Sequence, residues 1–127
     1  MRLRARGVAA WLALPLAACS GDTMLTGDTK TMTALPIAPY AIHEECMLMA
    51  AGDRLDFRFE ASAPVAFDIR YRDGIAIIST VSREDVRELA GVFASPLARR
   101  NCAHWEAGPE GAMVDYRLRL LGKGAPS

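Results

Sequence analysis

The sequence contains few of the residues on which enzyme catalysis usually depends. Of its 127 residues only two are histidines, His43 and His104, and glutamine is absent. It contains no Gly-x-Ser-x-Gly, phosphate-loop or His-Glu-x-x-His motif. His43 precedes Glu44, but no second histidine follows at the spacing that a zinc protease needs. We therefore expect a protein that is not an enzyme and that has no cofactor.

The chain also lacks an excess of charge of either sign. Its 15 lysines and arginines are balanced by 15 aspartates and glutamates. Without a basic surplus there is no long-range attraction to a phosphate backbone, so no nucleic-acid partner is expected. After residue 18 no apolar run of 18 or more residues occurs, which predicts no further membrane-spanning helix. The residues after position 18 suffice for one domain rather than two.

The first 18 residues have the three-part pattern of a secretory signal peptide. Arginines at positions 2, 4 and 6 give a cationic start, and Val8–Ala18 is apolar. This apolar stretch is too short to cross a hydrocarbon layer of about 30 Å. Leu16-Ala17-Ala18-Cys19 resembles the lipobox of bacterial lipoproteins. The resemblance implies cleavage before Cys19 and attachment of a lipid to its thiol.

The lipoprotein resemblance also predicts a location. The protein is expected in the cell envelope, on the periplasmic face of a membrane that it contacts through the lipid on Cys19. In Gram-negative lipoproteins an aspartate after the cysteine commonly retains the product in the inner membrane. Ser20 occupies that position here, which favours the outer membrane.

Two segments are expected to lie outside the folded domain. Ser20–Pro39 is rich in threonine, has no sustained periodicity and carries Pro36 near its end. Residues 19–39 are therefore predicted to be the lipidated cysteine followed by a flexible tether. The folded domain is predicted over residues 40–121, with a disordered tail over 122–127.

Apolar and charged residues alternate in three segments of the predicted domain, which is typical of half-buried strands. These segments are Arg54–Ala61, Val65–Tyr71 and Val114–Leu120. Weaker patterns predict strands at Ile42–Met49, Ile75–Val81 and Arg100–Glu106, and the continuous apolar run of Ile75–Val81 suggests a central strand. Turn sequences such as Ser62-Ala63-Pro64 separate the segments. Short strands at this spacing predict an all-β fold, an antiparallel β-sandwich of about 6–8 strands.

One segment has a helical pattern instead. Ser82-Arg83-Glu84-Asp85 resembles a capping box, and Val86, Leu89 and Phe93 follow at helical spacing. We predict a short helical turn that ends near Gly91 and leads into a strand. The alternative is a loop followed by a strand over Gly91–Ala94.

The predicted sandwich resembles the Golgi-dynamics (GOLD) domain of eukaryotic cargo receptors over about Tyr40 to Leu121. The resemblance rests on Glu45-Cys46, Gly52-Asp53-Arg54-Leu55-Asp56-Phe57, Phe67-Asp68-Ile69-Arg70-Tyr71, Cys102 and the Tyr116–Leu120 strand. It implies a disulfide between Cys46 and Cys102. It also implies a domain that binds proteins, here a partner in the envelope.

A metal site is the main alternative. Cys102-Ala103-His104 places a thiol and an imidazole on one face of a strand, and Cys46 and His43 offer further ligands. Such soft ligands suit Cu(I), so the alternative is a periplasmic copper-type binding lipoprotein. Glu44 and Glu45 point to opposite faces and are interpreted as a solvated pair.

The sequence therefore predicts a lipid-anchored, non-catalytic binding or structural module of the cell envelope. An inhibitor of an extracellular hydrolase is the second alternative.

Overall fold

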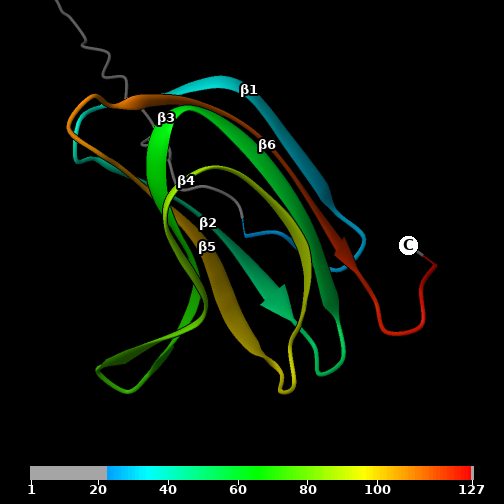
Figure 1. The fold of residues 1–127 in the computed structure, drawn as a ribbon. Coiled ribbons are helices and arrows are strands. Elements are labelled where there is room, and N and C mark those ends of the chain that lie inside the picture. The colour runs from blue at the N-terminus through cyan, green and yellow to red at the C-terminus, as the bar shows by residue number, and fades with distance from the viewer. Residues whose placement is uncertain (1–22, 127) are drawn as a thin grey trace, which may run out of the picture.

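The structure, a computed structural model, describes residues 23–126 and is all-β in that range, which confirms the predicted fold class. Its six strands are β1 (Thr29–Ile37), β2 (Ile42–Met49), β3 (Arg54–Asp73), β4 (Ala76–Ala94), β5 (Arg99–Ala107) and β6 (Ala112–Leu121) (Figure 1). All pairings between these strands are antiparallel. The predicted signal peptide and Cys19 lie outside the described residues. Within the described range there is no helix long and apolar enough to span a membrane.

The sandwich arises because one sheet folds over at the middle of β3. The first half of β3, up to Ala61, pairs with β6, whereas the second half, from Val65, pairs with β5. β4 follows β3 along both halves, so one layer is β1-β6-β3-β4 and the other is β2-β5-β3-β4. The predicted turn at Ser62-Ala63-Pro64 is therefore wrong: β3 continues through it. Pro64 lies where β3 changes partner, a place where a missing backbone N–H breaks no ladder bond to β5 or β6.

The core lies between the two layers. Phe57, Phe59 and Phe67 on β3 point inward and are at most 5% exposed, and Ile69, Tyr116 and Leu118 are buried with them, as the alternation predicts. The rings of Trp105 on β5 and Tyr116 on β6 stack across the layers with centroids 4.6 Å apart. Each buried Phe contributes about 2–3 kcal/mol of transfer free energy. The packing of large side chains from both layers defines a single core.

The first strand corrects the predicted tether. Thr29–Ile37 is β1, paired with β6, so the fold begins well before residue 40. A bulge between Met32 and Leu35, with Ala34 at a φ of 54°, spaces the inward residues unevenly. The bulge hides the period of two that would have identified the strand from sequence. Pro36 is tolerated because β1 is an edge strand of its layer.

β4 corrects the predicted helical turn. Ser82–Gly91 is part of one 19-residue strand that pairs with β3. Its register shifts on either side of Val86, and Asp85 has a φ of 61°, so a bulge shifts the inward side chains out of alternation. The apolar residues Val86, Leu89 and Phe93 therefore fall at a spacing that is typical of a helix. The apolar run of Ile75–Val81 is also not central, because β4 lies at an edge and Ile75 is 99% exposed.

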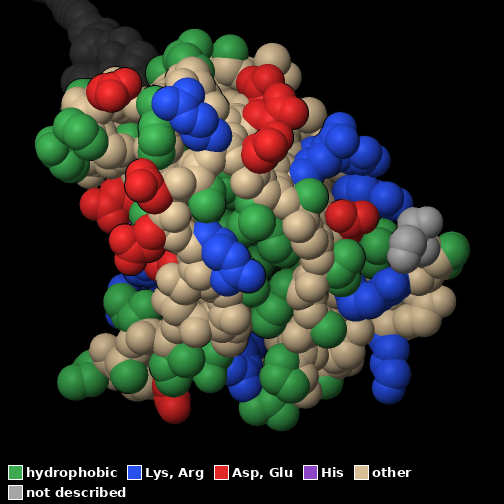
Figure 2. Space-filling model, viewed as in Figure 1, with side chains coloured by type: hydrophobic (Ala, Val, Ile, Leu, Met, Phe, Trp, Pro, Cys, Tyr) green, Lys and Arg blue, Asp and Glu red, His purple; other side chains and the backbone are tan. Residues whose placement is uncertain are grey.

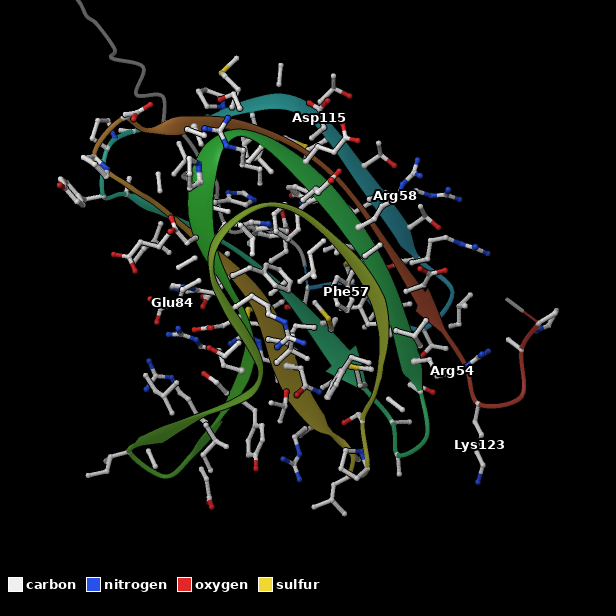
Figure 3. The ribbon with its side chains drawn as sticks, in the orientation of Figure 1. Arg54, Phe57, Arg58, Glu84, Asp115 and Lys123 are labelled. Atoms are coloured by element: carbon white, nitrogen blue, oxygen red, sulfur yellow. A yellow bond between two sulfur atoms is a disulfide. The ribbon has the colours of Figure 1, made fainter. Side chains whose placement is uncertain are left out.

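The end of the chain also differs from its prediction. Residues 122–126 lie against the start of β3 rather than forming a disordered tail. Arg54 donates a hydrogen bond to the carbonyl of Ala125, and the stem of Lys123 lies against Gly52 (Figure 3). Residue 127 is outside the described range.

Candidate functional site

The structure joins the two predicted cysteines in a disulfide. Cys46 on β2 and Cys102 on β5 stand directly opposite each other in the ladder, with Cα atoms 3.9 Å apart. Both side chains point away from the core, because Met47 and Ala103, their neighbours, are fully buried. The disulfide therefore lies on the outward face of the β2-β5 layer.

Of the four predicted copper ligands, Cys46, Cys102 and His104 share the outward face of β2 and β5, whereas His43 does not join them. His104 follows Cys102 on the outward face, but His43 points into the space between the layers. Within the described range the metal-type donors that cluster are those of Glu44, Cys46 and Cys102, which lie within 4.8 Å of one another. Both cysteines are oxidised, so no thiolate ligand is present in this state.

The structure reveals a partly buried polar cluster that the sequence interpretation missed, formed by Lys30, His43, Glu45 and Tyr116. Tyr116 donates a 2.6 Å hydrogen bond to Oε2 of Glu45. Nε2 of His43 lies 3.0 Å from the Tyr116 hydroxyl and 3.2 Å from Glu45 Oε2. Nζ of Lys30 lies 2.9 Å from the same carboxylate oxygen. We call these four residues the interlayer clasp, since β1 and β6 belong to one layer and β2 to the other.

The clasp fixes the charge of Glu45. Burial alone would raise the pKa of this carboxyl, but hydrogen bonds to His43, Lys30 and Tyr116 outweigh burial and lower the pKa to about 2. Burial and the Glu45 carboxylate raise the pKa of Tyr116. The predicted solvated pair is thus half right: Glu44 is exposed, whereas Glu45 is 6% exposed. Glu45 is two residues before Met47 and four before Met49, so it lies on the same inward face of β2 as these buried methionines.

The polar groups of the clasp are bonded to one another. The clasp has no serine or thiol nucleophile, and its carboxylate oxygens already have partners. Trp105 beside it is 1% exposed, and its indole N–H has no acceptor among the described residues. The His43 ring packs against the rings of Trp105 and Tyr116, and these two rings stack on each other.

The edges of the sandwich differ in how they are protected. β1 carries Pro36 and a bulge, at which Asp115 accepts a hydrogen bond from the Ala34 N–H. β2 is covered in part by Met24, which forms backbone hydrogen bonds with Cys46 and Leu48. No strand among the described residues pairs with the far edge of β4. That edge is 19 residues long. Its charges lie in its middle, and its pairing with β3 is irregular around Val86 and again between Ser79 and Val81.

One end of β4 projects from the body as a hairpin with the end of β3, which we call the β3–β4 hairpin (residues 71–80). The pairing of β3 with β5 stops at Arg70, so the hairpin extends beyond the layer (Figure 1). Ile75 and Ile77 are 99% and 49% exposed at its tip, and Figure 2 shows hydrophobic side chains on this projection. Arg99 stacks on the Tyr71 ring at its base, 3.8 Å from the centroid.

A charged groove of about 500 Å³ lies beside the middle of β4 and is lined by residues of β1, β3, β4 and β6. Arg58 and Arg117 are directly opposite each other, and Glu60 stands between Asp115 and Glu88. Adjacent acidic and basic areas are visible in Figure 2, and Figure 3 shows Arg58 and Asp115 on this side. Like charges directly opposite each other lower stability. The groove therefore presents adjacent basic and acidic areas.

The comparisons with known proteins bear on the fold alone. No family model matches the sequence, and no curated protein matches it. A solved structure of similar fold is the pre-peptidase C-terminal domain of a collagenase from Bacillus anthracis. It aligns with a TM-score of 0.55 at 8% identity, over 84% of this chain and 99% of that domain. The shared feature is a β domain of this architecture.

Proposed function

We propose that this protein is a lipid-anchored, non-catalytic module of the cell envelope that binds an extended segment of a partner protein along the far edge of β4. The observation that carries the proposal is the exposed edge itself, which continues into a hairpin with Ile75 and Ile77 at its tip. An edge of this length presents a row of backbone donors and acceptors. Another extended backbone is the ligand that satisfies such a row.

The side chains along β4 define the partner further. Ile77 and Val92, near its two ends, are 49% and 62% exposed, so apolar side chains of an added strand would gain contacts there. Between them lie Arg83, Glu84 and Glu88, of which Glu88 lines the charged groove. The proposed partner segment is therefore apolar at its ends and charged in the middle.

The absence of catalysis is supported by the chemistry of the described residues. The perturbed carboxylate, Glu45, is held by three hydrogen-bond partners inside the sandwich. The two cysteines are joined to each other, so neither supplies a nucleophilic thiolate. A module that holds a partner needs only a rigid scaffold and an accessible edge, both of which the fold supplies.

Anchoring through Cys19 would hold the sandwich close to the membrane. Met24 is buried against β2, five residues after Cys19. Five extended residues span at most about 17 Å. The partner would therefore be an envelope protein with a segment near the membrane surface.

Site-specific photo-crosslinking in cells tests the binding edge. A crosslinking amino acid at Ser79, on β4, should yield adducts whose partner peptides contain alternating apolar residues. The same group at Thr29, which is exposed on β1 outside the charged groove, is the matched control and should yield none. Ile75→Asp with Ile77→Asp should abolish the adduct at Ser79 while the purified domain keeps its thermal stability. Equal crosslinking from β1 and β4, or adducts that survive both substitutions, would contradict the proposed edge.

A separate experiment tests the anchor. Cys19→Ala should stop palmitate labelling and leave the chain unprocessed at that position. If this variant still incorporates palmitate and has the mass of the mature wild type, the lipoprotein part of the proposal is wrong.

A further inference from the structure

We propose that the outward face of β2 and β5 becomes a zinc site when the Cys46–Cys102 disulfide is reduced. The four ligands are the carboxylate of Glu44, the sulfurs of Cys46 and Cys102 and the imidazole of His104. Two thiolates, an imidazole and a carboxylate form a donor set that suits Zn²⁺. This site lies on a different surface from the β4 edge and does not rest on the proposed function.

The ladder places the four side chains side by side. Glu44 is directly opposite His104, and Cys46 is directly opposite Cys102. The two pairs are two residues apart along each strand, so all four point to the same face. The Glu44 carboxylate and both sulfurs already lie within 4.8 Å of one another. The set needs no change of register to converge.

His104 is suited to act as the nitrogen ligand. It points outward, yet neighbouring side chains leave it only 8% exposed. It follows Cys102 on the outward face of β5 and stands directly opposite Glu44 on β2, so its ring lies beside the other three donors.

Arg70 supplies the charge balance. It stands opposite Cys102 on β3, and its Nε is buried without a hydrogen-bond acceptor among the described residues. Two thiolates and one carboxylate carry three negative charges, so a bound Zn²⁺ leaves one, and the guanidinium lies beside it. Arg70 also pairs with Asp68, which holds it in place. A Cys102 thiolate would offer the buried Nε an acceptor that the disulfide does not.

The step that opens the site is thiol–disulfide exchange with a dithiol. One thiolate of the dithiol attacks a sulfur of the Cys46–Cys102 bond, which releases one cysteine and leaves the other in a mixed disulfide with the dithiol. The second thiolate of the dithiol then attacks its own sulfur in the mixed disulfide and releases the remaining cysteine. The dithiol becomes a disulfide, and Cys46 and Cys102 take up the two electrons and two protons as thiols. Binding of Zn²⁺ then releases these two protons.

The strands should stay paired after reduction. β2 and β5 are in register over eight residue pairs, of which the disulfide is one. Inward neighbours on both strands, such as Met47 and Trp105, are buried in the core and hold the register. The donors therefore remain opposite one another without the covalent link.

Zinc titration of the full chain carrying Cys19→Ala tests the proposal, because only the two cysteines in question then supply thiols. Oxidised and phosphine-reduced samples, the latter freed of reductant, are titrated against a chromophoric zinc chelator. We expect one zinc per reduced chain and none per oxidised chain. Glu44→Gln and His104→Asn should each weaken binding to the reduced chain by at least about 10-fold. Glu106→Gln makes the same charge change two residues after His104, on the same face of β5. It should leave zinc binding unaltered.

Circular dichroism and thermal unfolding of the same samples separate a built site from nonspecific capture by thiols. Zinc should raise the melting temperature of the reduced wild type and leave that of the oxidised protein unchanged. Equal zinc binding in both redox states would overturn the proposal. So would a reduced chain that fails to bind, that binds equally with Glu44→Gln and His104→Asn, or that loses its β spectrum and does not regain it with zinc.

Discussion

The hydroxyl of Tyr116 on β6 donates a 2.6 Å hydrogen bond to the carboxylate of Glu45 on β2, and so joins the two layers. On one side of the sandwich the layers are continuous through β3 and β4. On the other side β1 and β2 end their layers as edge strands, and the interlayer clasp connects them there. Polar side-chain bonds thus reinforce the side of the fold on which the two layers share no strand.

Removing the Tyr116 hydroxyl should weaken this connection. Tyr116→Phe keeps the ring that stacks on Trp105 but takes one donor from the buried Glu45 carboxylate. We expect the free energy of unfolding in urea to fall by about 1–3 kcal/mol. Tyr40→Phe is the matched control, because Tyr40 is 66% exposed. Equal effects of the two substitutions would show that the clasp does not contribute to stability.

The low pKa of Glu45 predicts a specific loss of stability in acid. Its folded pKa of about 2 lies below the ordinary value of 4.5, so the folded state favours the charged form. The resulting stabilisation, about 3 kcal/mol, is complete above pH 4.5 and is lost as the pH falls from there to about 2. Urea unfolding between pH 7 and pH 2 measures it.

Glu45→Gln should remove this part of the pH dependence and lower stability at pH 7, because Lys30 then lacks its carboxylate partner. Glu44→Gln, the exposed neighbour, should keep the acid transition of the wild type. A Glu45→Gln profile that parallels the wild type from pH 7 to pH 2 would refute the assignment.

The disulfide makes a third prediction. It closes a long loop, because Cys46 and Cys102 are 56 residues apart in the sequence. Chain entropy gives about 4 kcal/mol for a loop of this length. Replacing both cysteines with alanine should lower the free energy of unfolding by about that amount and leave the β spectrum at 20 °C intact. A loss below about 1 kcal/mol would mean that the unfolded chain gains little from release of the link.

The sequence predicts the strands that alternate cleanly and fails where bulges break the alternation. β2 spans the predicted Ile42–Met49, and the inward Phe57 and Phe59 are where period two places them. β1 and β4 each contain a residue with positive φ, Ala34 and Asp85, which moves the inward side chains out of phase. Such segments become strands because they pair with another strand. The local sequence pattern contains no information about that pairing.

The candidate sites show the same division. The cross-strand position of Cys46 and Cys102 follows from two strands that are legible in the sequence. The interlayer clasp needs Lys30, from the unrecognised β1, to meet Glu45 across the layers. The exposed edge of β4 depends on strand order, which no local pattern contains.

Two glycines provide the last prediction, since they share a backbone conformation and differ in their surroundings. Gly111 and Gly74 have φ angles of 69° and 66°. A Cβ at Gly74 would have no atom within 4 Å, whereas at Gly111 it would lie 2.9 Å from the carbonyl oxygen of Ile37. Gly74→Ala should therefore cost only the left-handed backbone strain, about 1–2 kcal/mol. Gly111→Ala should cost at least about 1 kcal/mol more, because the turn before β6 must move away from the end of β1.

Urea unfolding of the two variants compares these costs directly, and hydrogen exchange locates them. Protection in the Gly111→Ala variant should fall at Ile37 and Ala112, which are paired between β1 and β6. Protection in the Gly74→Ala variant should fall in the β3–β4 hairpin alone. Equal losses of stability would mean that the Gly108–Gly111 turn yields freely, and that Gly111 is required for its φ angle rather than for the closeness of β1.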